Sequence, residues 1–133
     1  MTRAVLADVG PLYAAVDESD EHHGRATVDL QKLAKEQRLT IIAYPTLLEA
    51  HALVLTRLGV AAGQAWLELI SEAAMINPDP EDYRQAIETL KRLPDQKITL
   101  FDALLGILAS RMGVKVWTYD HHFDVMRVPV WRS

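Results

Sequence analysis

Three short apolar segments, each followed by a helical pattern, limit what this chain can fold into. They are AVLA at 4–7, LTIIAY at 39–44 and VKVWTY at 114–119. Short apolar runs that contain β-branched residues are typical of buried strands. Because helical segments separate these runs, we expect the strands to pair in a parallel sheet with helices on both faces. The predicted fold class is α/β.

The segments between these strands have the pattern of amphipathic or buried helices. Helices are expected over 11–17, 22–38, 45–59, about 61–73, 81–93 and 99–113. Pro11 and Pro45 suit the first turn of a helix. AMIN at 74–77 is a weaker strand candidate, and VPVW at 128–131 predicts a short strand at an edge of the sheet.

Length and composition exclude several classes of protein. A chain of 133 residues, half of them apolar, fits a single domain over 1–133 whose core needs no metal or disulfide. The absence of cysteine excludes thiol chemistry and zinc–thiolate sites. A net charge of −4 argues against a simple cationic nucleic-acid binder, although an enzyme could still meet a phosphate with metal ions.

The apolar runs are all far shorter than the roughly 18 residues that a membrane span needs. The first ten residues, MTRAVLADVG, also lack the apolar region of a signal peptide. We therefore expect a soluble, cytoplasmic protein that does not associate with a membrane.

Four acids from distant segments are expected at one edge of the sheet. Asp8 and Asp120 follow strands, Glu49 lies about one turn into the helix after the second strand, and Asp102 lies in the first turn of the helix at 99–113. In open α/β sheets, ligands bind outside the carboxyl ends of the strands. The convergence of these acids predicts a site there.

Each acid also has an ordinary structural interpretation. Thr99 and Asp102 match a capping box at a helix start. Asp8 could cap the next helix, Glu49 could be an exposed helical acid, and Asp120 could be a turn residue. Each alternative is reasonable alone, and the shared location of the four acids is what favours a site.

Close carboxylates raise one another's pKa unless a cation neutralises them. Hard oxygen ligands suit Mg²⁺ or Mn²⁺, which can activate water and stabilise the leaving oxygen of a phosphodiester. The pattern therefore favours metal-assisted phosphodiester hydrolysis. A phosphatase with an aspartyl-phosphate is a rival, but Lys97 and Lys115 are badly placed for it. A domain that only binds RNA or a partner is the non-enzymatic alternative.

The ordered motifs resemble a known family across nearly the whole chain. They are LADVGPLYAAVDESDEHHGRA at 6–26, YPTLLEAHALVLTRLG at 44–59 and ITLFDALLGILASRMGVKVWTYDHHFD at 98–124. In order and spacing, they are similar to PIN-domain ribonucleases, and more narrowly to VapC-type toxins of bacterial toxin–antitoxin pairs.

This resemblance implies a three-layer α/β/α sandwich around a short parallel sheet, and an endoribonuclease that depends on Mg²⁺, with Mn²⁺ as a substitute. It implies a homodimer that cleaves RNA and is blocked by a VapB-like antitoxin. A PIN-like RNA-processing nuclease that is not a toxin is the alternative. The implied catalytic acids are Asp8, Glu49, Asp102 and Asp120, of which Asp8, Asp102 and Asp120 would hold the metal.

Thr99 and Thr118 occupy positions where the family often has a hydroxyl residue. The chain departs from the family at Val9, because the family commonly has Asp-Thr-Ser or Asp-Thr-Gly at the first acid, where this chain has Asp8-Val9-Gly10. Asp124 lies four residues after Asp120 and could support it if a helical turn follows the strand.

The histidines have structural interpretations as well as a possible role in this site. His121 and His122 lie near it, but an exposed turn is the favoured interpretation, and His51 is expected to be structural. Trp66 and Leu69 belong to an apolar helical face that could pair subunits.

Overall fold

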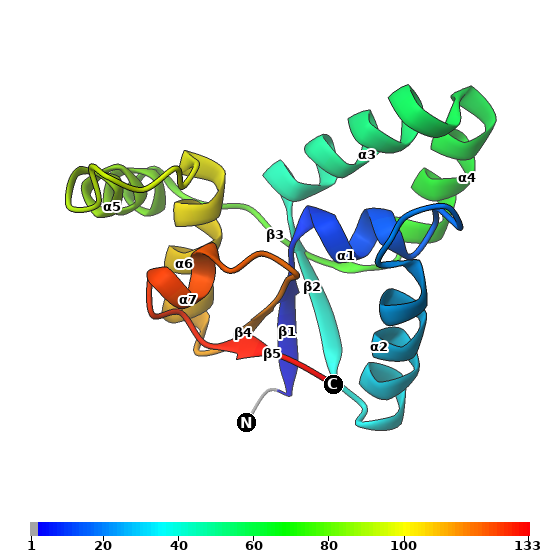
Figure 1. The fold of residues 1–133 in the computed structure, drawn as a ribbon, viewed down its shortest axis with the longest axis horizontal. Coiled ribbons are helices and arrows are strands. Elements are labelled where there is room, and N and C mark those ends of the chain that lie inside the picture. The colour runs from blue at the N-terminus through cyan, green and yellow to red at the C-terminus, as the bar shows by residue number, and fades with distance from the viewer. Residues whose placement is uncertain (1–2) are drawn as a thin grey trace.

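A five-stranded parallel sheet forms the centre of the computed structural model, which describes residues 3–133 (Figure 1). The strands are β1 (Ala4–Ala7), β2 (Leu39–Ala43), β3 (Ala74–Ile76), β4 (Lys115–Trp117) and β5 (Val130–Trp131). Their order is β3-β2-β1-β4-β5, and every neighbouring pair is parallel. The predicted α/β class is confirmed, and the two weaker strand candidates form the two edges of the sheet.

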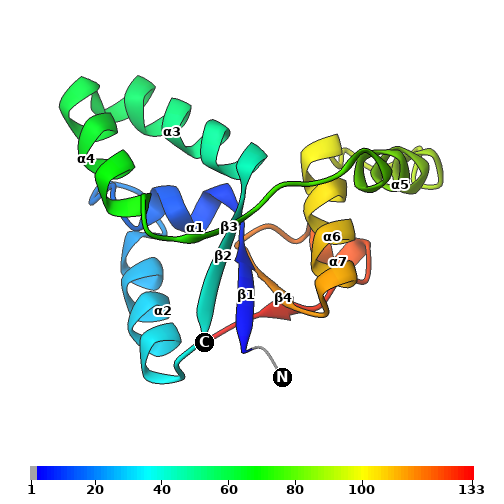
Figure 2. The same ribbon diagram turned by 180° about the vertical axis from the view of Figure 1, so that it is seen from behind.

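Helices cover both faces of this sheet. They are α1 (Val9–Ala14), α2 (His23–Lys35), α3 (Tyr44–Leu58), α4 (Val60–Ile70), α5 (Pro80–Lys91), α6 (Leu100–Met112) and α7 (His122–Val125). Helices α1 to α4 lie on one side of the sheet and α5 to α7 lie on the other, as two opposite views show (Figures 1 and 2). None of the helices between residues 3 and 133 has the length and apolarity that a membrane span requires.

The alternation of side chains along β1 divides the core between the two faces. Val5 packs with Leu12 of α1 and Leu33 of α2. Leu6 points to the opposite face and packs with Leu105 of α6 and with other side chains of that helix. Because β1 is buried on both faces, it reads as a continuous apolar run rather than as an alternating one.

The strand order reverses between β1 and β4. From β1 the chain moves outward to β2 and β3, and it then returns to build β4 and β5 on the other side of β1. At the carboxyl ends, the backbone N–H of Asp8 donates to the carbonyl of Trp117 at 3.0 Å. This reversal is the position where ligands bind in open α/β sheets, so the residues that follow β1 and β4 are candidates for a binding site.

Several differences from the sequence-based prediction lie near the carboxyl edge of the sheet. Helix α1 begins at Val9, because Asp8 itself caps the helix one residue after β1. Tyr44 starts α3 instead of ending β2. A short helix, α7, follows the turn after β4, and buried Phe123 anchors it in the core. These differences move side chains at the carboxyl edge of the sheet, where the candidate site lies.

Candidate metal centre

Asp8 is held rigidly at the end of β1. Its Oδ1 accepts a hydrogen bond from the backbone N–H of Val9 at 2.8 Å, and its Oδ2 accepts one from the hydroxyl of Thr118 at 2.8 Å. The Thr118 oxygen in turn accepts from the backbone N–H of Asp120 at 3.0 Å. Thr118 is buried, and it therefore connects the first and fourth predicted acids across the β1–β4 pair.

Burial raises the pKa of Asp8 to about 6, from an ordinary value of 3.8. Hydrogen bonds from Thr118 and Val9 oppose this rise, and the negative charges of Asp102 and Asp120 add to it. The site therefore concentrates negative charge around a carboxylate with little access to water. A bound cation would relieve this repulsion.

Asp102 occupies the first turn of α6, where two of its roles coincide. It forms a capping box with Thr99: the Thr99 hydroxyl oxygen accepts from the backbone N–H of Asp102 at 3.0 Å, and Asp102 Oδ2 accepts from the backbone N–H of Thr99 at 3.4 Å. The capping interpretation of this pair is confirmed. The same Oδ2 lies 3.0 Å from Nδ1 of His122, so Oδ1 is used by neither contact.

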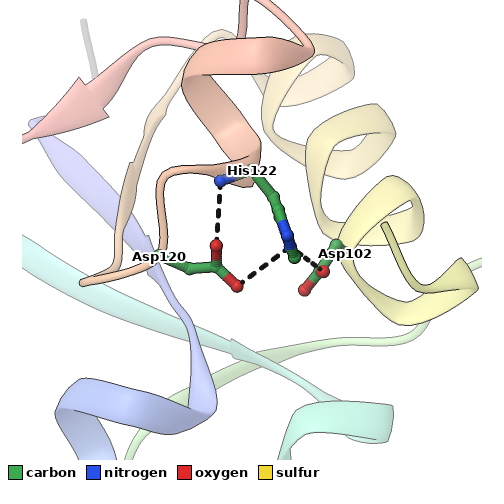
Figure 3. A group of neighbouring side chains, drawn as sticks. All are labelled: Asp102, Asp120 and His122. Atoms are coloured by element: carbon green, nitrogen blue, oxygen red, sulfur yellow. Dashed lines mark hydrogen bonds and ion pairs between the residues drawn. The ribbon is translucent and has the colours of Figure 1, made fainter. Parts of the chain in front are cut away.

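The turn after β4 brings Asp120 and His122 to this carboxylate. The backbone N–H of His122 donates to Asp120 Oδ1 at 2.8 Å, which fixes the orientation of the carboxylate. The His122 ring folds back, and its Nδ1 lies 3.2 Å from Asp120 Oδ2. Figure 3 shows the imidazole pointing between the carboxyl groups of Asp102 and Asp120.

Asp102, Asp120 and His122 form the candidate metal centre. One ligand atom from each lies within 4.8 Å of the others. Asp102 comes from α6, Asp120 from the turn after β4, and His122 from the start of α7. Two carboxylates with an imidazole provide the oxygen and nitrogen ligands that divalent ions such as Mg²⁺ and Mn²⁺ use in proteins. The donor set, together with the perturbed Asp8 beside it, fits such an ion.

The other two predicted acids have different surroundings. Glu49 lies in the second turn of α3, is exposed to solvent, and is outside the group of three residues. Asp124 lies in α7, and its Oδ2 pairs with the guanidinium of Arg132 at 3.0 Å. The helical turn that would place Asp124 beside Asp120 does exist, but Asp124 contacts a cation there rather than the acid cluster.

His122 is the site residue that sequence reasoning undervalued. The predicted exposed turn is correct for His121, whose side chain is 82% exposed, but wrong for His122, whose side chain is 23% exposed. The difference arises because α7 begins at His122 and Phe123 enters the core, so the ring of His122 turns toward α6. A histidine immediately before a buried aromatic residue was the available signal.

Two other histidine and aromatic positions have structural roles. His51 lies against Trp66, with ring centroids 6.4 Å apart, as expected for a structural histidine. Trp66 is buried with Tyr13 and Val54 in a cluster between α1, α3 and α4. Trp66 is therefore a core residue of the monomer, whereas Leu67 and Leu69 on the same helix are exposed, and a subunit-pairing role of that face stays a prediction.

The parallel order, the helices on both faces and the acids at the reversal point define a PIN-like α/β/α fold. No protein-family model and no curated protein sequence match this chain. Several solved structures do match this chain in fold. The sarcin-ricin loop cleaving toxin VapC20 of Mycobacterium tuberculosis superposes with a TM-score of 0.82 at 19% identity, over 97% of this chain and 99% of that one.

Two complexes share the same fold. VapBC2 of Rickettsia felis, bound to a DNA fragment from its promoter, gives a TM-score of 0.76 at 15% identity over 97% of this chain and 98% of that one. FitAcB of Neisseria gonorrhoeae gives 0.72 at 17% identity over 96% of each chain. The fold implied by the sequence motifs is therefore confirmed.

Proposed function

We propose that this protein is a divalent-metal-dependent endoribonuclease that acts as the toxin of a toxin–antitoxin pair. The observation that carries the proposal is the cluster of Asp102, Asp120 and His122 beside buried Asp8, at the reversal point of a parallel sheet. A VapC fold that carries this cluster has the ligands needed for metal-assisted cleavage of a phosphodiester.

The residues that would hold the ion are Asp102 and Asp120, with Asp8 next to them. When bound, the ion would lower the pKa of a water molecule and stabilise charge on the phosphate. The protein's own contribution is to fix the carboxylates in advance. Thr118 orients Asp8, and the backbone N–H of His122 orients Asp120.

His122 has a distinct role in this proposal. Its Nδ1 lies within 3.2 Å of carboxylate oxygens on both Asp102 and Asp120. It can therefore donate to either carboxylate when it carries a hydrogen at Nδ1 or offer a nitrogen ligand when it does not. We assign it to holding the spacing of the two acids. Glu49, an exposed acid in the second turn of α3, is retained as a proposed catalytic residue.

The test is RNA cleavage by purified protein with Mg²⁺, with Mn²⁺ and with a chelator. We expect cleavage only with metal, and a loss of roughly 100-fold or more for Asp102→Asn, the scale seen when one preorganised electrostatic group is removed. Asp95→Asn, an exposed loop acid, is the matched control and should cleave normally. Cleavage that survives both the chelator and Asp102→Asn would exclude this mechanism.

The proposed partners are RNA, a VapB-like antitoxin and a second copy of the chain. VapBC2 and FitAcB, which share the fold, are complexes. Leu48 on α3, with Val60 and Leu69 on α4, are each about 70% exposed and provide apolar surface for such contacts. Sedimentation of the purified chain at several concentrations would detect the homodimer, and a monomer throughout would exclude it.

A further inference from the structure

A small polar pocket opens directly beside the acid cluster. It has a volume of about 170 Å³, several times the ~30 Å³ share of one water molecule. Arg25 of α2, Asp124 of α7 and Arg132 line it, together with Tyr119 and Asp120 from the turn after β4. Asp120 belongs to both the pocket and the acid cluster, so the two adjoin one another.

Arg25 is positioned in this pocket by the ring of Tyr119. Its guanidinium carbon lies 4.2 Å from the ring centroid, a cation–π contact. Tyr119 is itself fixed, because its hydroxyl donates to buried Asp29 at 2.7 Å, and Asp29 also accepts from the indole N–H of Trp117 at 3.1 Å. Burial raises the pKa of Tyr119 above its usual range, and the hydrogen bond to Asp29 adds to this rise, so the phenol stays protonated.

Arg25 forms no ion pair with any acid within residues 3–133. Its contact with Tyr119 orients the guanidinium without neutralising it. An oriented guanidinium that no described carboxylate holds in an ion pair, with five N–H donors, matches the oxygens of a phosphate. Arg25 covers one face of the Tyr119 ring, and the centroid of the His22 ring lies 5.1 Å from that of Tyr119, so Tyr119 is engaged within the protein.

Arg132 supplies a second guanidinium, which can leave its ion pair with Asp124. It pairs with Asp124 at 3.0 Å, but the two side chains are 55% and 52% exposed. Exposed pairs of this kind contribute little free energy and exchange readily for another anion. Asp124 therefore restrains the positive charge of the pocket rather than adding to the metal site.

We propose that the pocket is a phosphate subsite, in which Arg25 and Arg132 bind a backbone phosphate of the RNA strand next to the phosphate at the acid cluster. The inference rests on the proposed nuclease function. It names the basic residues that bind the RNA backbone and so position the strand. The acids cannot do this, because carboxylates repel phosphate. Asp124 tunes the affinity by competing with the phosphate for Arg132.

The test is binding of a short single-stranded RNA, measured by fluorescence anisotropy in EDTA over a salt series. Arg25→Gln should raise Kd roughly tenfold, the effect of losing one charge-assisted hydrogen bond. It should also reduce the slope of log K against log[salt] by about 0.7, the contribution of one phosphate contact on a single strand. Arg132→Gln should act in the same direction.

Two variants control this measurement. Arg84→Gln removes an exposed arginine that pairs with Glu81 on α5, away from the pocket, and should leave Kd unchanged. Asp124→Asn frees Arg132 and should lower Kd, an opposite sign that misfolding cannot produce. Equal effects of Arg25→Gln and Arg84→Gln, or weaker binding by Asp124→Asn, would overturn the subsite. Absence of RNA binding by the unchanged protein would overturn it as well.

A cleavage assay on the same samples separates this inference from the proposed function. Binding that depends on Arg25 without any metal-dependent cleavage would retain the subsite and reject the nuclease. Cleavage by the unchanged protein, with normal RNA binding by Arg25→Gln, would retain the nuclease and reject the subsite.

Discussion

Asp120 and Asp124 lie four residues apart, yet they contact different partners. Asp120 meets His122 in the acid cluster, whereas Asp124 pairs with Arg132. We therefore expect Asp120→Asn to reduce metal-dependent RNA cleavage far more than Asp124→Asn, because only the first change removes a proposed metal ligand. Initial rates at saturating RNA would show the ranking. The opposite order would assign the role of the fourth acid to Asp124 instead of Asp120.

Asp8 makes stability depend on pH. Its folded-state pKa, about 6, exceeds its ordinary value of 3.8, so the folded state binds more protons between these pH values. Stability should therefore fall as pH rises from about 4 to 6. At roughly 1.4 kcal/mol per pKa unit, ionised Asp8 lowers the free energy of unfolding by about 3 kcal/mol at pH 7.

Asp8→Asn should consequently unfold at higher urea concentration than the unchanged protein at pH 7 in EDTA, with the advantage shrinking toward pH 4. The Asn oxygen can keep the helix cap on Val9, and its side-chain NH2 can donate to the Thr118 hydroxyl oxygen, which reverses the direction of that hydrogen bond. Asp95→Asn in an exposed loop should have no comparable effect. An equal advantage at both pH values would contradict the assignment to ionised Asp8.

The positions of the acids were easier to predict from the sequence than the positions of the side chains that contact them. The gathering of Asp8, Asp102 and Asp120 follows from their positions after strands and at a helix start, which topology alone determines. The ring of His122 could not be placed, because its direction depends on where α7 begins. Val9, which lacks the hydroxyl expected beside Asp8, packs against a core cluster, and Thr118, directly after β4, donates to Asp8 instead.

Helix α6 is the element that determines where Asp102 points. Thr99 caps its first turn through the backbone N–H of Asp102. Thr99→Ala should lower the free energy of unfolding by about 1 kcal/mol, the usual cost of losing a cap. It should also reduce cleavage, because Asp102 loses part of its support. Thr99→Ser keeps the hydroxyl and is the matched control. Urea denaturation and cleavage rates would check both effects.

The elements themselves were largely predictable because each carries a local signal. Apolar runs, Pro45 at a helix start and the Thr99 capping box depend on neighbours in sequence. The start of α1 and the existence of α7 were missed, since both depend on contacts made elsewhere. Asp8 caps α1 while it is held by β4, and Phe123 anchors α7 against the core around α6.

The toxin proposal is tested on the whole molecule in cells. Induced expression should arrest growth, and co-expression of an antitoxin encoded beside it should restore growth. Asp102→Asn expressed at the same level should be harmless, since folding is retained and the acid cluster is lost. Growth is followed by optical density and protein level by immunoblot. Harmless expression of a protein that cleaves RNA in vitro would instead indicate a role in RNA processing.

The hydrogen bond between Asp8 and Thr118 joins residues near opposite ends of the sequence. A chain emerging from the ribosome therefore carries Asp8 early but cannot complete the acid cluster until β4 and the turn after it have been made. Fragments that end before Thr118 have no assembled centre, so under the toxin proposal incomplete translation products should be harmless to the cell that makes them. Under the same proposal, an antitoxin that is already present has the whole time of synthesis to bind the nascent chain before the acid cluster is complete.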